Sequence, residues 1–167
     1  MPQFKYHYRR YNEFDVLKVN LPTVAGILYF CRHVLGLLII GMALRGGRGG
    51  RIDTGGAFDG LLEPIYMLAD IPALFVLLTM MCRHPKASRL FRLIWRASPY
   101  LLLTSAVMYF GFLADRIGVD LGQYGAAVWT SIAATVTVVV YVFAAPYARD
   151  LFRQFPAAAE ETDGRSS

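Results

Sequence analysis

The chain has 167 residues, of which 56% are apolar, and it carries a formal net charge of +5. A soluble domain of this length can build one core with less apolar sequence, so the composition argues against a soluble globular class. The positive charge would suit a nucleic-acid partner, but cations that flank membrane helices and face anionic lipid head groups explain it more simply. We therefore expect a lipid bilayer, and no nucleic acid, as the partner.

The apolar residues gather in four blocks, each long enough to cross a bilayer. About 30 Å of hydrocarbon takes about 20 residues of helix, and the blocks cover residues 21–44, 61–82, 93–114 and 123–145. Lipid offers no partner to open backbone groups, so each block should form a helix. The sequence predicts an all-α integral membrane protein with four transmembrane helices in a domain over residues 21–146.

The segments outside the blocks determine the predicted topology. Residues 1–20 mix aromatic and cationic side chains, which predicts a cytoplasmic or interfacial segment, and residues 147–167 should form a cytoplasmic tail with a disordered end. The N-terminal segment, the loop after the second block and the tail hold twelve Lys and Arg residues, whereas the other two loops hold four. The positive-inside rule then places both termini in the cytoplasm. The first block lacks a small-residue cleavage site, which favours a retained helix over a signal peptide.

Three charged or titratable residues lie well inside the blocks, away from their ends: Arg32, His33 and Asp70. A charge near the bilayer centre costs ~2.5 kcal/mol or more, so such residues usually find partners or line a path. Counted from the cytoplasmic ends of their helices, Arg32 and Asp70 both lie roughly 15–18 Å deep. We therefore expect Arg32 to pair with Asp70, with His33 at a similar height but pointing about 100° away. The cluster is either a pin that fixes helix register, which we favour, or part of a proton or anion path through His33 and Asp70.

The triplet Cys-Arg-His occurs twice, at residues 31–33 and 82–84. Two Cys and two His residues can form a tetrahedral metal site. In the predicted topology, however, the first triplet lies near mid-membrane and the second at the cytoplasmic surface, about 15 Å apart in depth. We expect neither a metal site nor a disulfide from this repeat. No residue pattern indicates a catalytic or cofactor-binding site.

Small residues repeat every four positions along the fourth block. They form two stripes, Ala126, Thr130 and Ala134 beside Ala127, Ser131 and Thr135. Small residues let helices approach closely in lipid. We expect a helix-packing face at Ala126, Thr130 and Ala134, either within the chain or against a partner subunit.

The stretch leading into the first block carries a recognisable series of residues: Tyr11, Leu17, Lys18, Arg32 and His33. In this series residues 11–40 resemble the YfeZ-like family of small, uncharacterised bacterial inner-membrane proteins, although Asp15 stands where a Gly is expected. The resemblance implies a location in the bacterial inner membrane and supplies no catalytic residues.

Two functions remain open from the sequence. We favour a non-enzymatic inner-membrane protein that acts through helix packing, as an accessory or assembly subunit whose partner is another membrane protein or a second copy. The alternative is a small oligomeric transporter, or a proton or ion conduit, that uses Arg32, His33 and Asp70. A redox subunit is a third and weaker hypothesis.

Overall fold

The structure, a computed structural model, describes residues 6–7, 10–12, 16–45, 64–117 and 126–156. This part of the chain contains no β-strand, although one antiparallel bridge joins Tyr11 to Leu17. Its helices are α1 (Leu21–Phe30), α2 (Arg32–Arg45), α3 (Pro64–Met81), α4 (Arg89–Ile117), α5 (Ala126–Ala144) and α6 (Pro146–Arg153). The prediction of an all-α fold is confirmed for the described residues.

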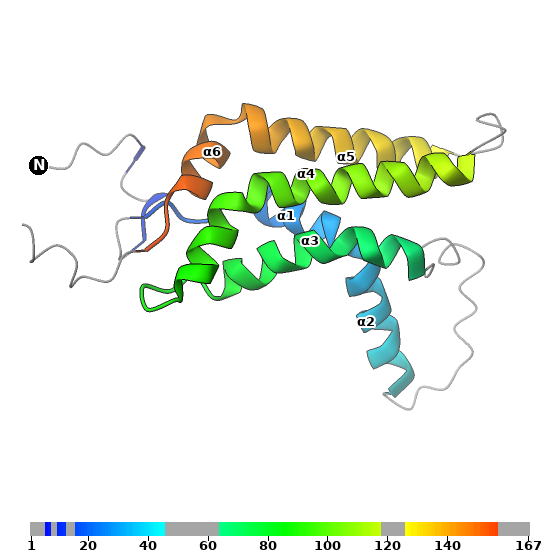
Figure 1. The fold of residues 1–167 in the computed structure, drawn as a ribbon, viewed down its shortest axis with the longest axis horizontal. Coiled ribbons are helices and arrows are strands. Elements are labelled where there is room, and N and C mark those ends of the chain that lie inside the picture. Colours follow the sequence, from blue (N-terminus) through cyan, green and yellow to red (C-terminus); the bar gives the residue numbers. More distant parts are fainter. Residues whose placement is uncertain (1–5, 8–9, 13–15, 46–63, 118–125, 157–167) are drawn as a thin grey trace, which may run out of the picture.

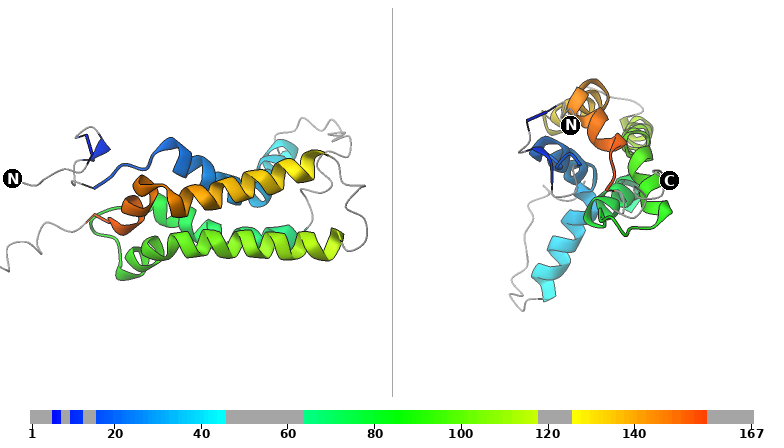
Figure 2. Two further views of the ribbon diagram at one scale, coloured as in Figure 1. Left: turned by 90° about the horizontal axis from the view of Figure 1, so that it is seen from above. Right: turned by 90° about the vertical axis from the view of Figure 1, so that its left-hand side faces the viewer.

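The helices α1, α3, α4 and α5 form an elongated bundle from which α2 projects sideways (Figure 1). The most extensive helix–helix contact is between α3 and α4, which run side by side in opposite directions (Figure 1, Figure 2). The short helix α6 lies at one end of the bundle, together with the N-terminal segment and the turn between α3 and α4. The described parts of the chain nearest both termini therefore share one end of the molecule.

The chain bends sharply in two places that the apolar blocks did not predict. The prediction of one continuous helix over residues 21–44 is wrong, because α1 and α2 are separate helices with an angle of 77° between them. A second bend, of 67°, separates α5 from α6. Pro146 begins α6, a position that suits proline because the first residue of a helix needs no N–H partner. Apart from Pro146, this helix falls within the predicted tail. The predicted disordered end of the tail falls on residues 157–167, outside the described residues.

Helix α4 is long and apolar enough to cross a membrane over Arg89–Asp115. The number of such spans rises to as many as three if each bent pair, α1 with α2 and α5 with α6, counts as one. Helix α3 is apolar but shorter, over Ile65–Met81. The structure thus agrees with the prediction that the chain has at least one helix able to cross a membrane. It does not confirm four full-length spans.

The core joins α6 and α1 to the longer helices. The fully buried indole of Trp95 donates its N–H to the carbonyl of Leu151 at 3.0 Å, and its ring lies 5.1 Å from that of Phe152. These contacts hold α6 against α4. On the other side of the bundle Gly26 lets α1 approach α5 closely, since a Cβ at that position would lie 2.9 Å from Cγ1 of Val138.

Arg83 ties three segments together at the end of the bundle that holds α6. Its guanidinium donates to the carbonyls of Leu17 at 2.8 Å and Gln154 at 3.0 Å, and it lies 4.9 Å from the ring of Trp95. The side-chain oxygen of Gln154 in turn accepts the N–H of Leu17 at 3.0 Å. Burial lowers the pKa of Arg83 to about 10. A residue that the sequence marks only as a topological cation therefore has a structural role.

Candidate functional site at the helix break

The break between α1 and α2 contains neither proline nor glycine to cause it. Cys31 lies between the helices with φ −94° and ψ 9°, and its N–H donates to the carbonyls of Ile27 and Leu28. A helix that ends leaves carbonyls without partners, and a helix that begins leaves N–H groups without partners. Because Cys31 is fully buried, these groups depend on side chains of the protein rather than on water.

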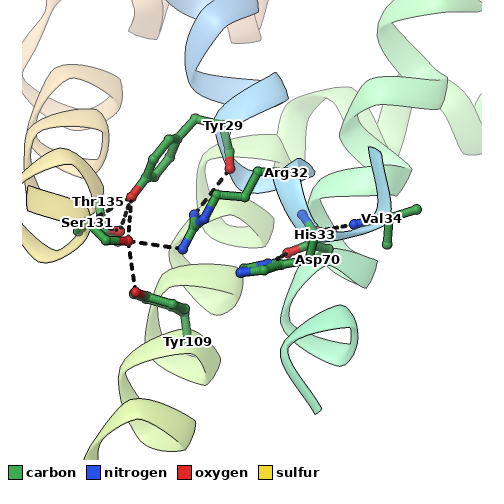
Figure 3. Close-up of polar contacts among 8 residues, drawn as sticks. All are labelled: Tyr29, Arg32, His33, Val34, Asp70, Tyr109, Ser131 and Thr135. Carbon is green, nitrogen blue, oxygen red and sulfur yellow. Dashed lines mark hydrogen bonds and ion pairs between the residues drawn. The ribbon is translucent and has the colours of Figure 1, made fainter. Parts of the chain in front are cut away.

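Asp70, on α3, satisfies the N-terminus of α2. Its Oδ2 accepts the backbone N–H groups of His33 at 2.9 Å and Val34 at 3.1 Å. Its Oδ1 lies 2.9 Å from Nδ1 of His33 (Figure 3). The side chains of Asp70 and His33 are both buried. A carboxylate is favourable at a helix N-terminus because the N–H groups and the helix dipole both attract negative charge. Asp70 therefore caps α2 from a neighbouring helix.

Arg32 lies on the other side of the break and faces α1 and α5. One of its guanidinium nitrogens donates to the carbonyl of Tyr29 at 3.2 Å, and the other donates to Oγ of Ser131 at 3.3 Å (Figure 3). A cation near the C-terminus of a helix is favourable, because the carbonyls there carry partial negative charge. Arg32 thus provides a donor to a carbonyl at the end of α1, just as Asp70 provides acceptors to the N–H groups at the start of α2.

The predicted contact between Arg32 and Asp70 is wrong, and the helix break explains why. The two residues do lie on elements that meet, since α2 contacts α3. At the bend, however, the side chain of His33 and the backbone N–H groups of His33 and Val34 point toward Asp70 (Figure 3). The side chain of Arg32 points toward Ser131. The partner of Asp70 is therefore His33, and the predicted cluster is divided between two neighbouring sets of contacts.

Aromatic rings surround both sets of contacts, and no pattern in the sequence predicted their place there. The guanidinium of Arg32 lies 4.3 Å from the ring centroid of Tyr29 and 4.6 Å from that of Tyr109. The imidazole of His33 stacks on Tyr66 at 5.5 Å and on Tyr109 at 6.2 Å. The one sequence feature that could have pointed to these rings is that they are tyrosines within apolar helices. A tyrosine hydroxyl needs a hydrogen-bond partner when it is buried.

The hydroxyl groups join this cluster to α5. The hydroxyl of Tyr29 donates to the carbonyl of Ser131 at 2.7 Å and lies 3.0 Å from the hydroxyl of Thr135. The hydroxyl of Tyr109 lies 2.8 Å from Oγ of Ser131. The inward face of α5 is therefore the one that carries Ser131 and Thr135.

The predicted packing face lies beside that inward face. Ala126 and Thr130 are exposed and Ala134 is half-buried, and the hydroxyl of Thr130 donates to the carbonyl of Ala126 within its own helix. Within this single chain, close packing on the face of Ala126 and Thr130 is not seen. Whether a partner packs there stays a prediction.

Among the described residues no three His, Cys, Asp or Glu side chains gather as a metal-binding group. Cys31 and Cys82 are both free thiols, the first buried and the second exposed.

These features define an all-helical protein with at least one helix able to cross a membrane and a buried polar cluster at a helix break. A family model described as "Protein of unknown function (DUF2919)" matches residues 64–154, more than half of the chain, and the chain belongs to this family. Comparison with curated proteins and with solved structures finds no match. The matched range includes Asp70 but not residues 11–40, so the YfeZ-like resemblance stays a prediction.

Proposed function

We propose that the protein is a non-enzymatic accessory or assembly subunit of the bacterial inner membrane, and that another membrane protein subunit packs against α2. In this proposal the chain crosses the membrane four times: the first crossing includes α1 and α2, and α3, α4 and α5 make the other three. Both termini lie in the cytoplasm. The shared end of the N-terminal segment, the α3–α4 turn and α6 supports this topology, as does the excess of cations in those segments.

The projection of α2 is the observation that carries the proposal. Helix α1 has 10 residues and is about 15 Å long, so a chain that enters from the cytoplasm reaches roughly the middle of the bilayer at the break. Helix α2 has 14 residues, a length of about 21 Å. With α1 along the bilayer normal, the 77° bend lets α2 rise only about 5 Å further. Its C-terminus at Arg45 would then still lie within the hydrocarbon layer.

Lipid tails cannot satisfy the end of such a helix. The last carbonyls of α2 have no partners within the helix. The charge of Arg45, the last residue of α2, is also costly at this depth. Another protein subunit can supply hydrogen-bond donors and acceptors there, which is the argument for a protein partner rather than for lipid alone. The same helix exposes Leu38, Ile39 and Met42, at 50%, 66% and 62%, so it also offers an apolar surface for packing.

The test is purification of the full chain from native membranes in mild detergent, with native mass spectrometry of the intact particle. We expect a defined assembly, which the double variant Leu38→Ala with Met42→Ala weakens. The matched control is Leu103→Ala with Val107→Ala, an outward-facing pair on α4 with the same four-residue spacing. A lone monomer from wild-type membranes, or equal behaviour of the two double variants, would contradict the proposal.

A second candidate function is favoured by the helix break itself. Discontinuous helices in membranes are typical of transporters, which bind ions and substrates where the half-helices meet. The pair of His33 and Asp70 lies at such a junction. A proton conduit predicts that proteoliposomes carry a proton flux that Asp70→Asn abolishes while the variant still inserts and folds. Wild-type vesicles no leakier than protein-free ones would rule this candidate out.

A further inference from the structure

A pocket of about 520 Å³ opens where α6 crosses the ends of α4 and α5. Three cationic side chains line it, Arg96 from α4 and Arg149 and Arg153 from α6. The same pocket has an apolar wall, which includes Tyr100 and Phe143. The pocket therefore combines a cluster of positive charge with an adjoining apolar surface.

The three guanidinium groups have no hydrogen-bond or ion-pair partner among the described residues, unlike those of Arg32 and Arg83. The acidic residue nearest to them in sequence, Asp150, accepts a hydrogen bond from the hydroxyl of Tyr6 at 2.8 Å. The donors of Arg96, Arg149 and Arg153 are therefore available to an anion. Their planar guanidinium groups match the geometry of phosphate oxygens in particular.

The fold brings these charges together against their mutual repulsion. Arg149 and Arg153 lie four residues apart on α6, a spacing at which like charges destabilise a helix. The other side of α6 is buried through Ala148 and Leu151, which fixes the direction in which the arginines point. An anion bound between α6 and Arg96 would offset this repulsion.

The positive surface continues beyond the pocket. A neighbouring pocket of about 390 Å³ is lined by Arg89, Arg92, Leu93 and Arg96, so Arg96 belongs to both. Interfacial basic pockets between membrane helices are suited to the head groups of anionic lipids. The pocket is placed for such a ligand, because the proposed topology puts this end of α4 at the cytoplasmic face.

The apolar wall distinguishes a lipid from a free anion. Tyr100 lies one helical turn beyond Arg96, and its ring makes an edge contact with Phe143 at 6.1 Å. Both rings are exposed, at 67% and 37%. A free phosphate would use the arginines and leave this surface uncovered, whereas a phospholipid would cover it with an acyl chain.

We propose that this pocket is a binding site for an anionic phospholipid, with the phosphate at Arg96, Arg149 and Arg153 and an acyl chain along Tyr100 and Phe143. The inference rests on the proposed membrane topology but not on the proposed partner subunit. It assigns a specific role to cations that the sequence marks only as topological.

The first test uses the variant Trp129→Phe, which leaves Trp95 as the single tryptophan of the chain. Trp95 contacts Phe152, a residue that lines the pocket. The purified full-length variant in bilayers is titrated with phosphatidylglycerol or phosphatidylcholine brominated on the acyl chains. We expect brominated phosphatidylglycerol to quench Trp95 preferentially, and millimolar inorganic phosphate not to displace it. Equal quenching by both lipids, or displacement by phosphate, would overturn the proposal.

The second test removes the charges. The double variant Arg149→Gln with Arg153→Gln should weaken phosphatidylglycerol binding about thirtyfold, since each arginine near an anionic surface contributes about a factor of five. The control is Lys18→Gln with Lys86→Gln, which removes the same charge from positions outside the pocket and should bind normally. Equal loss in both variants would contradict the site. If the test variant fails to fold, the quenching result still decides the inference. A chain that does not insert into bilayers would overturn the membrane topology and this inference together.

Discussion

Replacing Asp70 by alanine removes the group that caps α2. The carboxyl oxygens accept two backbone N–H groups, from His33 and Val34, and pair with Nδ1 of His33, all at 2.9–3.1 Å. Asp70 is 2% exposed, so water does not replace these bonds. Each buried polar group left without a partner costs about 1–3 kcal/mol. We therefore expect Asp70→Ala to lower the free energy of unfolding by about 3–5 kcal/mol, the range for breaking a buried pair.

Asp70→Asn is the graded comparison. Asparagine keeps one acceptor oxygen and can still cap a helix N-terminus, so we expect roughly half the loss, about 2 kcal/mol. Thr79→Val on the same helix is the matched control. Thr79 is also fully buried, but its hydroxyl donates only to the carbonyl of Phe75 in its own helix. Its removal should therefore cost about 1 kcal/mol or less.

The assay is equilibrium unfolding in mixed detergent micelles, followed by far-ultraviolet circular dichroism. Hydrogen exchange adds a local measurement, because the amides of His33 and Val34 should lose protection in Asp70→Ala before the rest of α2. The account of the helix break is refuted if Asp70→Ala costs no more than Thr79→Val, or if those two amides exchange as slowly as in the wild type.

Two further predictions concern packing elsewhere in the bundle. Gly26→Ala places a methyl group against Val138 on α5, and this overpacking should outweigh the gain in helix propensity and destabilise the chain by about 1 kcal/mol. Gly41→Ala meets open space and should be neutral or stabilising by up to about 1 kcal/mol. The melting temperature should therefore fall in Gly26→Ala and stay unchanged or rise in Gly41→Ala. Arg83→Met leaves two carbonyls without their donor, and it should make the N-terminal segment cleavable by chymotrypsin at a concentration that spares the wild type. Unchanged cleavage would mean that Arg83 does not hold this segment.

The helical class of the chain was predictable because each apolar block satisfies its own backbone, and that condition is local. The break at Cys31 was not predictable, because no proline or glycine marks it. The side chains that bind the two residues after it, Asp70 and Ser131, lie on other helices. Asp70 is 39 residues from Cys31 along the chain, and a sequence read without its fold does not show which helices become neighbours.

The candidate site was predicted in its members but not in its pairing. Buried ionisable residues are few in apolar segments, which is why Arg32, His33 and Asp70 could be singled out. Their pairing depended on an assumed straight helix, for which equal depth favoured Arg32 as the partner of Asp70. The bend turns His33 and two backbone N–H groups toward Asp70 instead. The tyrosines and Ser131 were not predicted as part of the site, because they contact one another only where three helices meet in the fold.

The central claim is that α2 contacts another membrane protein subunit, and photocrosslinking in living cells tests it most directly. A photoreactive amino acid replaces Ile39 on α2 or, as the control, Val107 on α4, two apolar positions with similar exposure of 66% and 61%. The account predicts a discrete product of higher mass with Ile39 and none with Val107. No product at Ile39, or the same product at both positions, would contradict it.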